Sequence, residues 1–374
     1  MNLLASMMEL QLPTPTAGLT SALSVGMNDD GTLHEMVYLF GGCKSPYIPI
    51  LRDDNALPDD DDEDFVLTSL PHEFVCPEVS DSIFIFDPSN EHTKVMIEGK
   101  SMPRKRHRHS SIAVNGLIWV IGGVDEYGSM IDEIDVYDSL KEQWKTLDTG
   151  LELIEVSGPT EDSIISHQMA DHCAFEIDGF IFITGGYDSF NNALAHTVMI
   201  DTVASIENNT LVYEFKSPLL NSRGSCSAAF HANYAFVAGG FTQDDGFCEA
   251  MKSVEIYDAV SDEWFEMEHS MKQGRANSAL FYYKGKIVAF GGENRGRFDS
   301  ATGNCVDPFH SNTLDLDTNM QLPGRLTYPI SKHVVEILDL IVDSKPNFAA
   351  KWKSKKVRKI LVKITVIHSI LALL

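Results

Sequence analysis

Three arginines, Arg106, Arg223 and Arg275, are the residues of this sequence best suited to gripping a charged ligand. A guanidinium presents a planar fork of donors that pairs with both oxygens of a carboxylate, so arginines that converge on one face could hold an acidic group of a partner. The alternative is that they hydrogen-bond loop carbonyls and hold neighbouring structural units together. The sequence leaves both interpretations open.

A second group consists only of residue types that ligate zinc: His167, Asp171, His172 and Cys173. His172 and Cys173, however, occupy the same places in their unit as His109 and Ser110 in an ordinary strand, which argues against a metal. The acidic run at 59–64 lacks the glycine-punctuated spacing of an EF-hand loop and is interpreted as a solvated charge run. We therefore expect no bound metal.

No motif of a known catalytic site occurs in the sequence. A nucleophile elbow, a phosphate-binding loop, an HExxH helix and a dinucleotide fingerprint are all missing from it. We therefore assign no catalytic residues, expect no cofactor, and predict that the chain is not an enzyme.

The charge balance disfavours nucleic acid as a partner. The chain has 29 Lys and Arg against 54 Asp and Glu, a net charge of −25 that repels phosphate backbones. Its densest basic stretch, residues 104–109, has no interleaved aromatic residues. We interpret that stretch as a loop that pairs with neighbouring acidic loops, and we expect a protein partner with a basic surface.

The six cysteines are scattered through the chain without short paired spacings: Cys43, Cys76, Cys173, Cys226, Cys248 and Cys305. This pattern is neither a zinc signature nor a dense disulfide framework, so reduced thiols in a cytoplasmic or nuclear protein are predicted. The first residues have no basic segment ahead of their apolar ones, which disfavours secretion.

One unit recurs along the chain, a short β-rich run that stops at a Gly-Gly pair. The pairs are Gly41-Gly42, Gly122-Gly123, Gly185-Gly186, Gly239-Gly240 and Gly291-Gly292. A strand-like run precedes most of the glycine runs, and a run closing on aspartate follows them. In two units Tyr-Asp is followed by tryptophan at the same spacing, as Tyr137, Asp138 and Trp144 and as Tyr257, Asp258 and Trp264. Two copies with one spacing make coincidence a poor explanation.

Each unit is therefore predicted to form four short strands. A lone sheet of this kind cannot bury both faces, whereas sheets stacked radially about an axis cover one another, which is the β-propeller arrangement. We predict an all-β propeller of four-stranded antiparallel blades. Five repeats are visible, which allows five or six blades.

The pattern of apolar run, Gly-Gly, Tyr-Asp and Trp resembles the signature of kelch-type propellers, the class that includes galactose oxidase. That resemblance covers about residues 13–352 and implies an arginine before the first strand of each unit. The repeat offsets place these positions at Arg275, Arg223, Met169 and Arg106, so one of the four departs from the family pattern.

The predicted units span about 13–98, 103–149, 166–217, 221–270 and 273–352, with insertions at 43–81 and 293–330. Residues 1–12 could supply a closing strand. The basic then apolar segment 353–374 could be a last strand, a tail anchor, a nuclear import signal or an error at the gene end. A membrane association is not expected.

The resemblance implies a protein-binding scaffold or adaptor that uses the loop faces of the propeller, and we expect it to act as a monomer. Two alternatives remain at this point. The chain could be the substrate-recognition subunit of a ubiquitin ligase, although no BTB or F-box segment is visible in it. It could also be a kelch-fold enzyme acting on a sugar or another small molecule, because a fold does not decide a function.

Overall fold

The computed structural model describes residues 18–27, 33–44, 48–49, 74–76, 78–87, 97–149, 169–242, 249–267, 270–283, 286–290, 292, 294, 297–299 and 304–306. In these residues almost all regular structure is antiparallel strand, and α2 (Thr202–Asn208) is the one helix. No helix in this part of the chain is long and apolar enough to cross a membrane. The predicted all-β class is confirmed.

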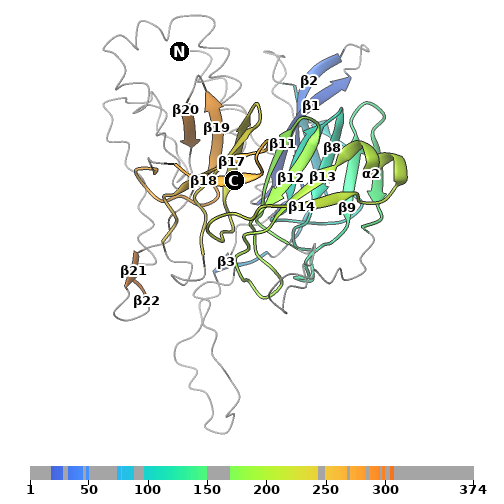
Figure 1. The fold of residues 1–374 in the computed structure, drawn as a ribbon. Helices are drawn as coiled ribbons and strands as arrows, with labels where there is room; N and C mark the ends of the chain where they lie inside the picture. Colours follow the sequence, from blue (N-terminus) through green and yellow to red (C-terminus); the bar gives the residue numbers. More distant parts are fainter. Residues whose placement is uncertain are drawn as a thin grey trace, which may run out of the picture.

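Four sheets of four strands form complete blades, each laid out in chain order (Figure 1). Blade 1 contains β1 (Thr20–Met27), β2 (Leu33–Phe40), β5 (Ile83–Phe86) and β6 (Ile97–Glu98). Blade 2 contains β7 (Ser110–Val114), β8 (Leu117–Ile121), β9 (Ile134–Asp138) and β10 (Gln143–Leu147). Blade 3 contains β11 (Cys173–Ile177), β12 (Phe180–Thr184), β13 (Thr197–Asp201) and β14 (Tyr213–Lys216).

Blade 4 contains β15 (Ser227–His231), β16 (Tyr234–Ala238), β17 (Val254–Asp258) and β18 (Glu263–Glu266). The paired strands β19 (Ala279–Tyr283) and β20 (Lys286–Phe290) begin a fifth blade. Two small hairpins lie in the insertions, β3 (Ile48–Pro49) with β4 (Phe74–Val75), and β21 (Arg297–Asp299) with β22 (Asn304–Val306). The number of blades beyond these stays a prediction, as do the unit boundaries.

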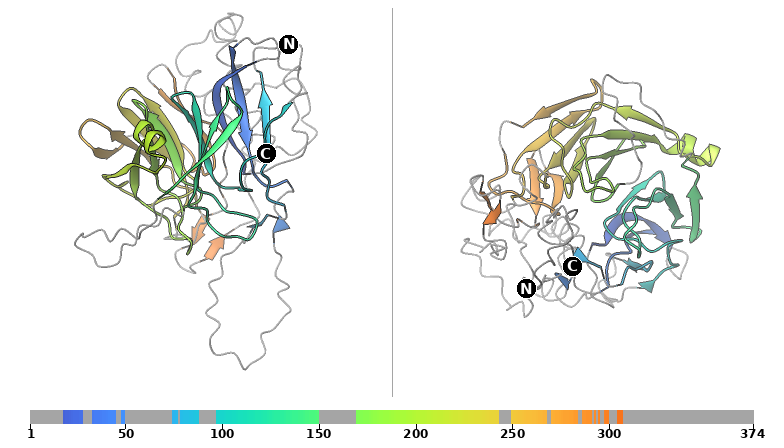
Figure 2. Two further views of the ribbon diagram at one scale, coloured as in Figure 1. Left: turned by 90° about the vertical axis from the view of Figure 1, so that its right-hand side faces the viewer. Right: turned by 90° about the horizontal axis from the view of Figure 1, so that it is seen from below.

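The blades stand around a common centre, as the view along the axis shows (Figure 2, right). Their first strands β1, β7, β11, β15 and β19 contact one another in succession and are therefore the inner strands. The acidic run at 59–64, the N-terminal segment and the tail from 353 lie outside the described residues.

The hydrophobic core consists of layers between successive blades. The layer between blades 2 and 3 joins Trp119 and Leu147 to Ile181 and Ile200, which are all at most 1% exposed. Comparable layers join blades 1 and 2, blades 3 and 4, and blades 4 and 5. Because both faces of a blade are covered, strands such as β8 are buried almost continuously instead of on alternate residues. Each large side chain buried in this way contributes roughly 1.5–3 kcal/mol.

A chain of backbone hydrogen bonds runs around the inner end of the blades. Arg108 donates its N–H to Gly18 O, and Asp171 donates to Arg108 O at 2.9 Å. Ser225 then donates to Asp171 O and Asn277 to Ser225 O, both at 2.8 Å. All five residues have φ between 51° and 62°, in the left-handed region. The same strained backbone turn therefore recurs in each blade and links it to the blade before.

The expectation of reduced thiols is wrong for four of the six cysteines. Cys43 is bonded to Cys76 within the first unit, with their Cα atoms 5.6 Å apart, and Cys173 is bonded to Cys226 between blades 3 and 4, at 5.8 Å. The partners are separated by 33 and 53 residues in the sequence. Such separations give no sequence signature of a disulfide, because the cysteines are brought together only when the insertion folds back and the blades stack.

Candidate partner-binding face

The strand directions give the ring two different faces. In each complete blade the second strand ends on its Gly-Gly pair, so the loop from the second to the third strand lies at that end. The connection into the next blade reaches the same end. We call this end the glycine face, and the opposite end, with the loops between first and second and between third and fourth strands, the hairpin face.

The second glycine of each pair binds the next blade through its backbone. Gly42, Gly123, Gly186 and Gly240 donate N–H groups to the carbonyls of Arg106, Met169, Arg223 and Arg275 respectively, at 2.8–2.9 Å. We call these four acceptor residues the hub positions. They are the positions at which the repeat offsets place the family's arginine, so this register corresponds to a repeated junction between blades.

The first glycine of each pair occupies a position that no other residue type fits, as Gly185 illustrates. Gly185 has φ +67°, and a Cβ on it would lie 2.5 Å from the carbonyl oxygen of Arg223 in the next blade. An L-residue is therefore excluded both by its backbone conformation and by the close approach of the neighbouring blade.

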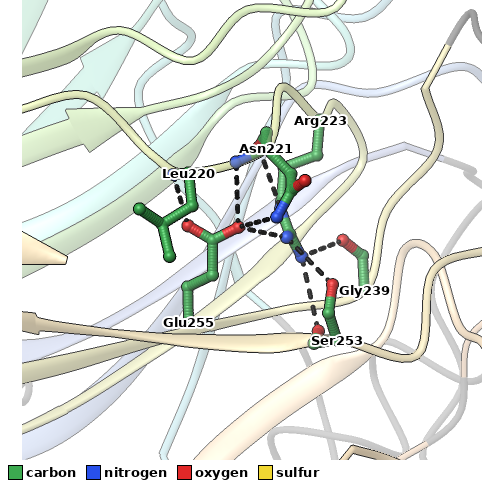
Figure 3. Close-up of polar contacts among 6 residues, drawn as sticks. All are labelled: Leu220, Asn221, Arg223, Gly239, Ser253 and Glu255. Carbon is green, nitrogen blue, oxygen red and sulfur yellow. Dashed lines mark hydrogen bonds and ion pairs between the residues drawn. The ribbon is translucent and has the colours of Figure 1, made fainter. Parts of the chain in front are cut away.

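Two of the hub arginines are fully buried and neutralised. The Arg223 guanidinium donates to the carbonyl of Gly239 at 3.0 Å, to Ser253 Oγ at 3.0 Å and to Glu255 at 2.5 Å (Figure 3). Glu255 is itself fully buried and accepts further hydrogen bonds from the backbone N–H groups of Leu220 and Asn221. A buried ion pair of this kind is tolerated because nearly every polar atom has a partner.

Blade 2 repeats this arrangement. Arg106 donates to the Gly122 carbonyl at 3.0 Å and pairs with Asp135, which also accepts from Thr146 Oγ1 at 2.6 Å. Burial lowers the pKa of Arg106 to about 10, and the neighbouring Asp135 carboxylate opposes that shift. The guanidinium therefore stays charged near neutral pH.

The geometry does not offer these arginines to a partner. Arg106 and Arg223 are 0% exposed and Arg275 is 2% exposed. We therefore assign the three arginines to the junctions between blades, which was the alternative interpretation of the sequence. Recognition of a partner's carboxylate by Arg106 or Arg223 would require their buried ion pairs to open first.

Met169, the one hub residue that is not arginine, shows a matched change. Its blade also lacks the acid, because Val198 stands at the register position of Asp135 and Glu255. Met169 and Val198 are both buried and belong to the same apolar cluster. Charge and countercharge have thus been replaced together, and no unpaired buried charge remains at this hub position.

The repeat signature residues serve the same junctions. The Trp144 ring lies 4.8 Å from that of Tyr137, and Trp264 lies 4.9 Å from Tyr257. The indole of Trp264 donates to the Ser217 carbonyl of blade 3 at 2.8 Å. The indole of Trp144 likewise donates at 3.2 Å, to Lys100 O, after the last strand of blade 1.

The aspartates at the strand ends organise turns. Asp138 accepts from the N–H groups of Leu140 and Lys141, and Asp258 accepts from that of Val260. In blade 3 the equivalent Asp201 caps the N-terminus of α2 by accepting from Ala204 N at 2.9 Å. This helix occupies the place where blades 2 and 4 carry a turn, and the sequence did not predict it.

The basic stretch at 104–109 is largely paired within the protein. Arg104 contacts Asp135 at 2.6 Å, and Lys105 contacts Glu126 at 2.5 Å. Arg108 binds Asp171 of the next blade at 2.7 Å. The expected pairing of this loop with acidic neighbours is thus present in the structure.

The residues considered for zinc are occupied otherwise. His172 is buried and shares a 2.6 Å hydrogen bond with Ser110, while Cys173 is in a disulfide. Burial lowers the pKa of His172 to about 4. His167 lies outside the described residues, and the part of the chain that the structure describes contains no group of three or more ligands suited to a metal.

Two loops of the glycine face display aromatic rings that the sequence analysis did not single out. In blade 2, Asp125 accepts from the N–H groups of Tyr127 and Ser129 at 2.8 and 2.9 Å. In blade 3, Asp188 accepts from Phe190 and Asn192 at 2.9 and 2.8 Å. The two turns have the same hydrogen bonds at the same register, and in each the aromatic residue lies four positions after the second glycine.

The aromatic rings themselves have almost no contact with the fold. Tyr127 is 85% exposed and Phe190 is 83% exposed, the highest values among the large hydrophobic residues described. A side chain that packs on nothing contributes little to stability, whereas aromatic residues dominate protein interfaces. Comparing the residues after each Gly-Gly, Val-Asp-Glu-Tyr in one unit and Tyr-Asp-Ser-Phe in the next, would have revealed them.

The loop that carries Tyr127 is also acidic. Asp132 and Glu133 are adjacent at its end, and the pKa of Asp132 is raised by partial burial and by the neighbouring Glu133 carboxylate. The Glu133 carboxylate also pairs with Arg104 at 3.4 Å, so this charge is partly balanced within the protein.

The repeats seen in this geometry match a known family. A family model described as the kelch motif matches residues 105–149 and 222–268, which correspond to blades 2 and 4. Blades 2 and 4 are thus kelch repeats, and the chain has a kelch-type propeller fold. The solved structure of YjhT, which is 13% identical, has a TM-score of 0.51 and covers 76% of this kelch propeller and 74% of its own chain. At that identity the likeness shows the fold alone.

Curated relatives carry kelch names as well. Kelch domain-containing protein 3 of Rattus norvegicus is 21% identical over 204 residues, which cover 52% of this chain and 49% of that protein. Kelch-like protein 25 of Xenopus tropicalis is 28% identical over 152 residues, covering 39% and 24%. Kelch-like protein 23 of Homo sapiens is 23% identical over 215 residues, covering 58% and 33%. This kelch propeller thus spans about half or less of the curated relatives it matches.

Proposed function

We propose that this kelch propeller is a non-enzymatic scaffold that binds a protein partner on its glycine face, with Tyr127 and Phe190 as anchors. The observation that carries the proposal is the pair of rings, 85% and 83% exposed, held at one register by matching turns on neighbouring blades. Rigid turns that present aromatic rings lose little entropy when a partner covers them.

Charge supports a partner with a basic surface. The chain carries −25 net charge, and Asp132 and Glu133 lie in the same loop as Tyr127. A partner that offers an apolar patch flanked by lysine or arginine would satisfy both features of the face. We further propose that the protein acts as a monomer in the cytoplasm or nucleus.

A purification experiment tests the proposed face. The intact protein is compared with Tyr127→Ala/Phe190→Ala by quantitative mass spectrometry of co-purified proteins. A specific partner should be lost from the double variant by about 30-fold or more, since even one hot-spot aromatic contributes about 2 kcal/mol.

The matched control is Tyr234→Ala/Val260→Ala, which removes two exposed side chains from the hairpin face. That variant should retain the partner. Equal retention by both double variants would overturn the glycine face as the binding surface. A ubiquitin-ligase subunit among the retained proteins would instead favour the adaptor interpretation, and turnover in a metabolite screen would favour an enzyme.

A further inference from the structure

A polar side-chain contact recurs between neighbouring inner strands at a fixed register. It joins the first residue of one inner strand to the residue that precedes the next inner strand. Between blades 1 and 2 it is Thr20 Oγ1 with His109 Nε2 at 2.8 Å. Between blades 2 and 3 it is Ser110 Oγ with His172 Nε2 at 2.6 Å. We call such a contact a clasp.

The clasp between blade 4 and the fifth blade is also polar. Ser227 Oγ lies 2.8 Å from Ser278 Oγ and donates to the Ser278 carbonyl at 2.5 Å. The sequence therefore uses different polar pairs for the same contact. Only the distance between the two backbone segments has to be maintained for such pairs to substitute for one another.

Between blades 3 and 4 the same register holds the disulfide of Cys173 with Cys226. The first residue of β11 is Cys173, as Ser110 is of β7, and Cys226 directly precedes β15, as His172 directly precedes β11. One of the four described clasps is thus a covalent bond, and it is the one whose state depends on the surrounding thiols.

We propose that the Cys173–Cys226 disulfide is a redox-responsive clasp that sets how tightly blades 3 and 4 are held together. Cys226 is only partly buried, whereas Cys173 is 3% exposed. A thiolate of an external dithiol therefore attacks Cys226 Sγ and releases the Cys173 thiolate, which takes up a proton. The second thiol of the reductant then closes its own disulfide and releases Cys226, so two protein thiols replace one protein disulfide.

The junction has other bonds that keep the reduced ring folded. Gly186 N donates to Arg223 O at 2.8 Å, and Trp264 donates to Ser217 O at 2.8 Å. An apolar layer that includes Phe175 and Tyr257 lies between the two blades. Reduction therefore loosens one junction without dismantling the blades. Such a device suits a compartment that normally keeps thiols reduced, where protein disulfides are mostly transient.

The test uses the full chain carrying Cys43→Ser/Cys76→Ser, which removes the other described disulfide. Hydrogen exchange is followed by mass spectrometry with and without dithiothreitol, and iodoacetamide labelling reports the thiols formed. On reduction, exchange at 173–177 and 227–231 should rise about 10-fold or more, while 110–114 changes little. The unfolding midpoint should fall by roughly 5–10 °C.

A second variant keeps the test decisive. Adding Cys173→Ser/Cys226→His rebuilds the serine–histidine clasp of blades 2 and 3, and the exchange at both strands should then be indifferent to dithiothreitol. Conversely, Ser110→Cys/His172→Cys should form a new disulfide, detected as two thiols protected from iodoacetamide. The proposal is overturned if reduction leaves exchange at blades 3 and 4 unchanged, or if the rebuilt clasp responds to dithiothreitol as the disulfide does.

Discussion

Blades 3 and 4 form the same kind of junction with the preceding blade, but the side chains at their hub positions are apolar in one and charged in the other. Blade 4 buries an ion pair, Arg223 with Glu255, whereas blade 3 buries Met169 against Val198. In both, the hub carbonyl accepts the hydrogen bond from the glycine of the preceding blade. The difference teaches that the junction is made by the backbone hydrogen bond. The side chains at the hub can be charged or apolar, provided that no buried charge is left without a partner. Either pair satisfies that condition, but a mixture of the two does not.

The largest expected effect comes from making that mixture. Glu255→Val leaves the fully buried Arg223 without its countercharge, and we expect a loss of about 3–5 kcal/mol of unfolding free energy. Urea unfolding monitored by circular dichroism measures it. Glu263→Val, an exposed acid on the same sheet, is the control and should change little. A loss below about 1 kcal/mol for Glu255→Val would show that the pair contributes no such constraint.

Acid should weaken blade 3 through its buried histidine. The folded-state pKa of His172 is lowered to about 4 by burial, with Asp171 opposing the shift, against 6.5 for the unfolded chain. The stability from its neutral form is complete above pH 6.5 and is lost as pH falls towards 4, by roughly 3 kcal/mol in total.

Unfolding curves between pH 7 and 4 for wild type and His172→Gln test this pH dependence. The glutamine keeps a donor for Ser110 but cannot take up a proton, so its stability should decline less steeply. Because all other groups titrate in both proteins, the difference between the two curves isolates the histidine. Parallel curves would contradict the assignment.

Converting blade 4 to the blade 3 chemistry should have a smaller effect. Arg223→Met/Glu255→Val removes both charges, so the double variant should recover most of the loss caused by Glu255→Val and end within about 1–2 kcal/mol of wild type. A double-mutant cycle with Arg223→Met measures the coupling. Additive losses in the two single variants would be incompatible with a compensated pair.

The smallest expected effect concerns the indole contacts. Trp264→Phe keeps a ring beside Tyr257 but removes the hydrogen bond to Ser217 O, and it should lose about 1 kcal/mol beyond the change in packing. Trp144→Phe removes the longer 3.2 Å bond in blade 2 and should lose less. Thermal unfolding of the two variants side by side gives the ranking, which a larger loss for Trp144→Phe would reverse.

The repeat register was readable from the sequence because glycine pairs and aromatic spacings are local. The Gly-Gly runs predicted the second strands, and Trp264 was placed in its unit by its distance from Asp258. The role of the arginines was not decidable in that way. Whether Arg223 is buried depends on Glu255, which lies two strands further along the blade.

The candidate site was missed for a related reason. Tyr127 and Phe190 are ordinary aromatic residues in sequence, and their exposure follows from turns that Asp125 and Asp188 organise. The disulfides were missed because the stacking of blades brings distant cysteines together. The charged residues that suggest binding in the sequence lie buried at the hub, whereas the candidate binding surface is formed by two exposed aromatic residues.

The chain of left-handed residues on the inner strands bears on how the ring is made. Each of its links joins a unit to the unit synthesised just before it, from Arg108 with Gly18 onwards to Asn277 with Ser225. A blade leaving the ribosome therefore finds its docking surface already present, without waiting for sequence that has yet to be translated. Assembly of the described blades can proceed in the order of synthesis through contacts between neighbours, as in other repeat proteins.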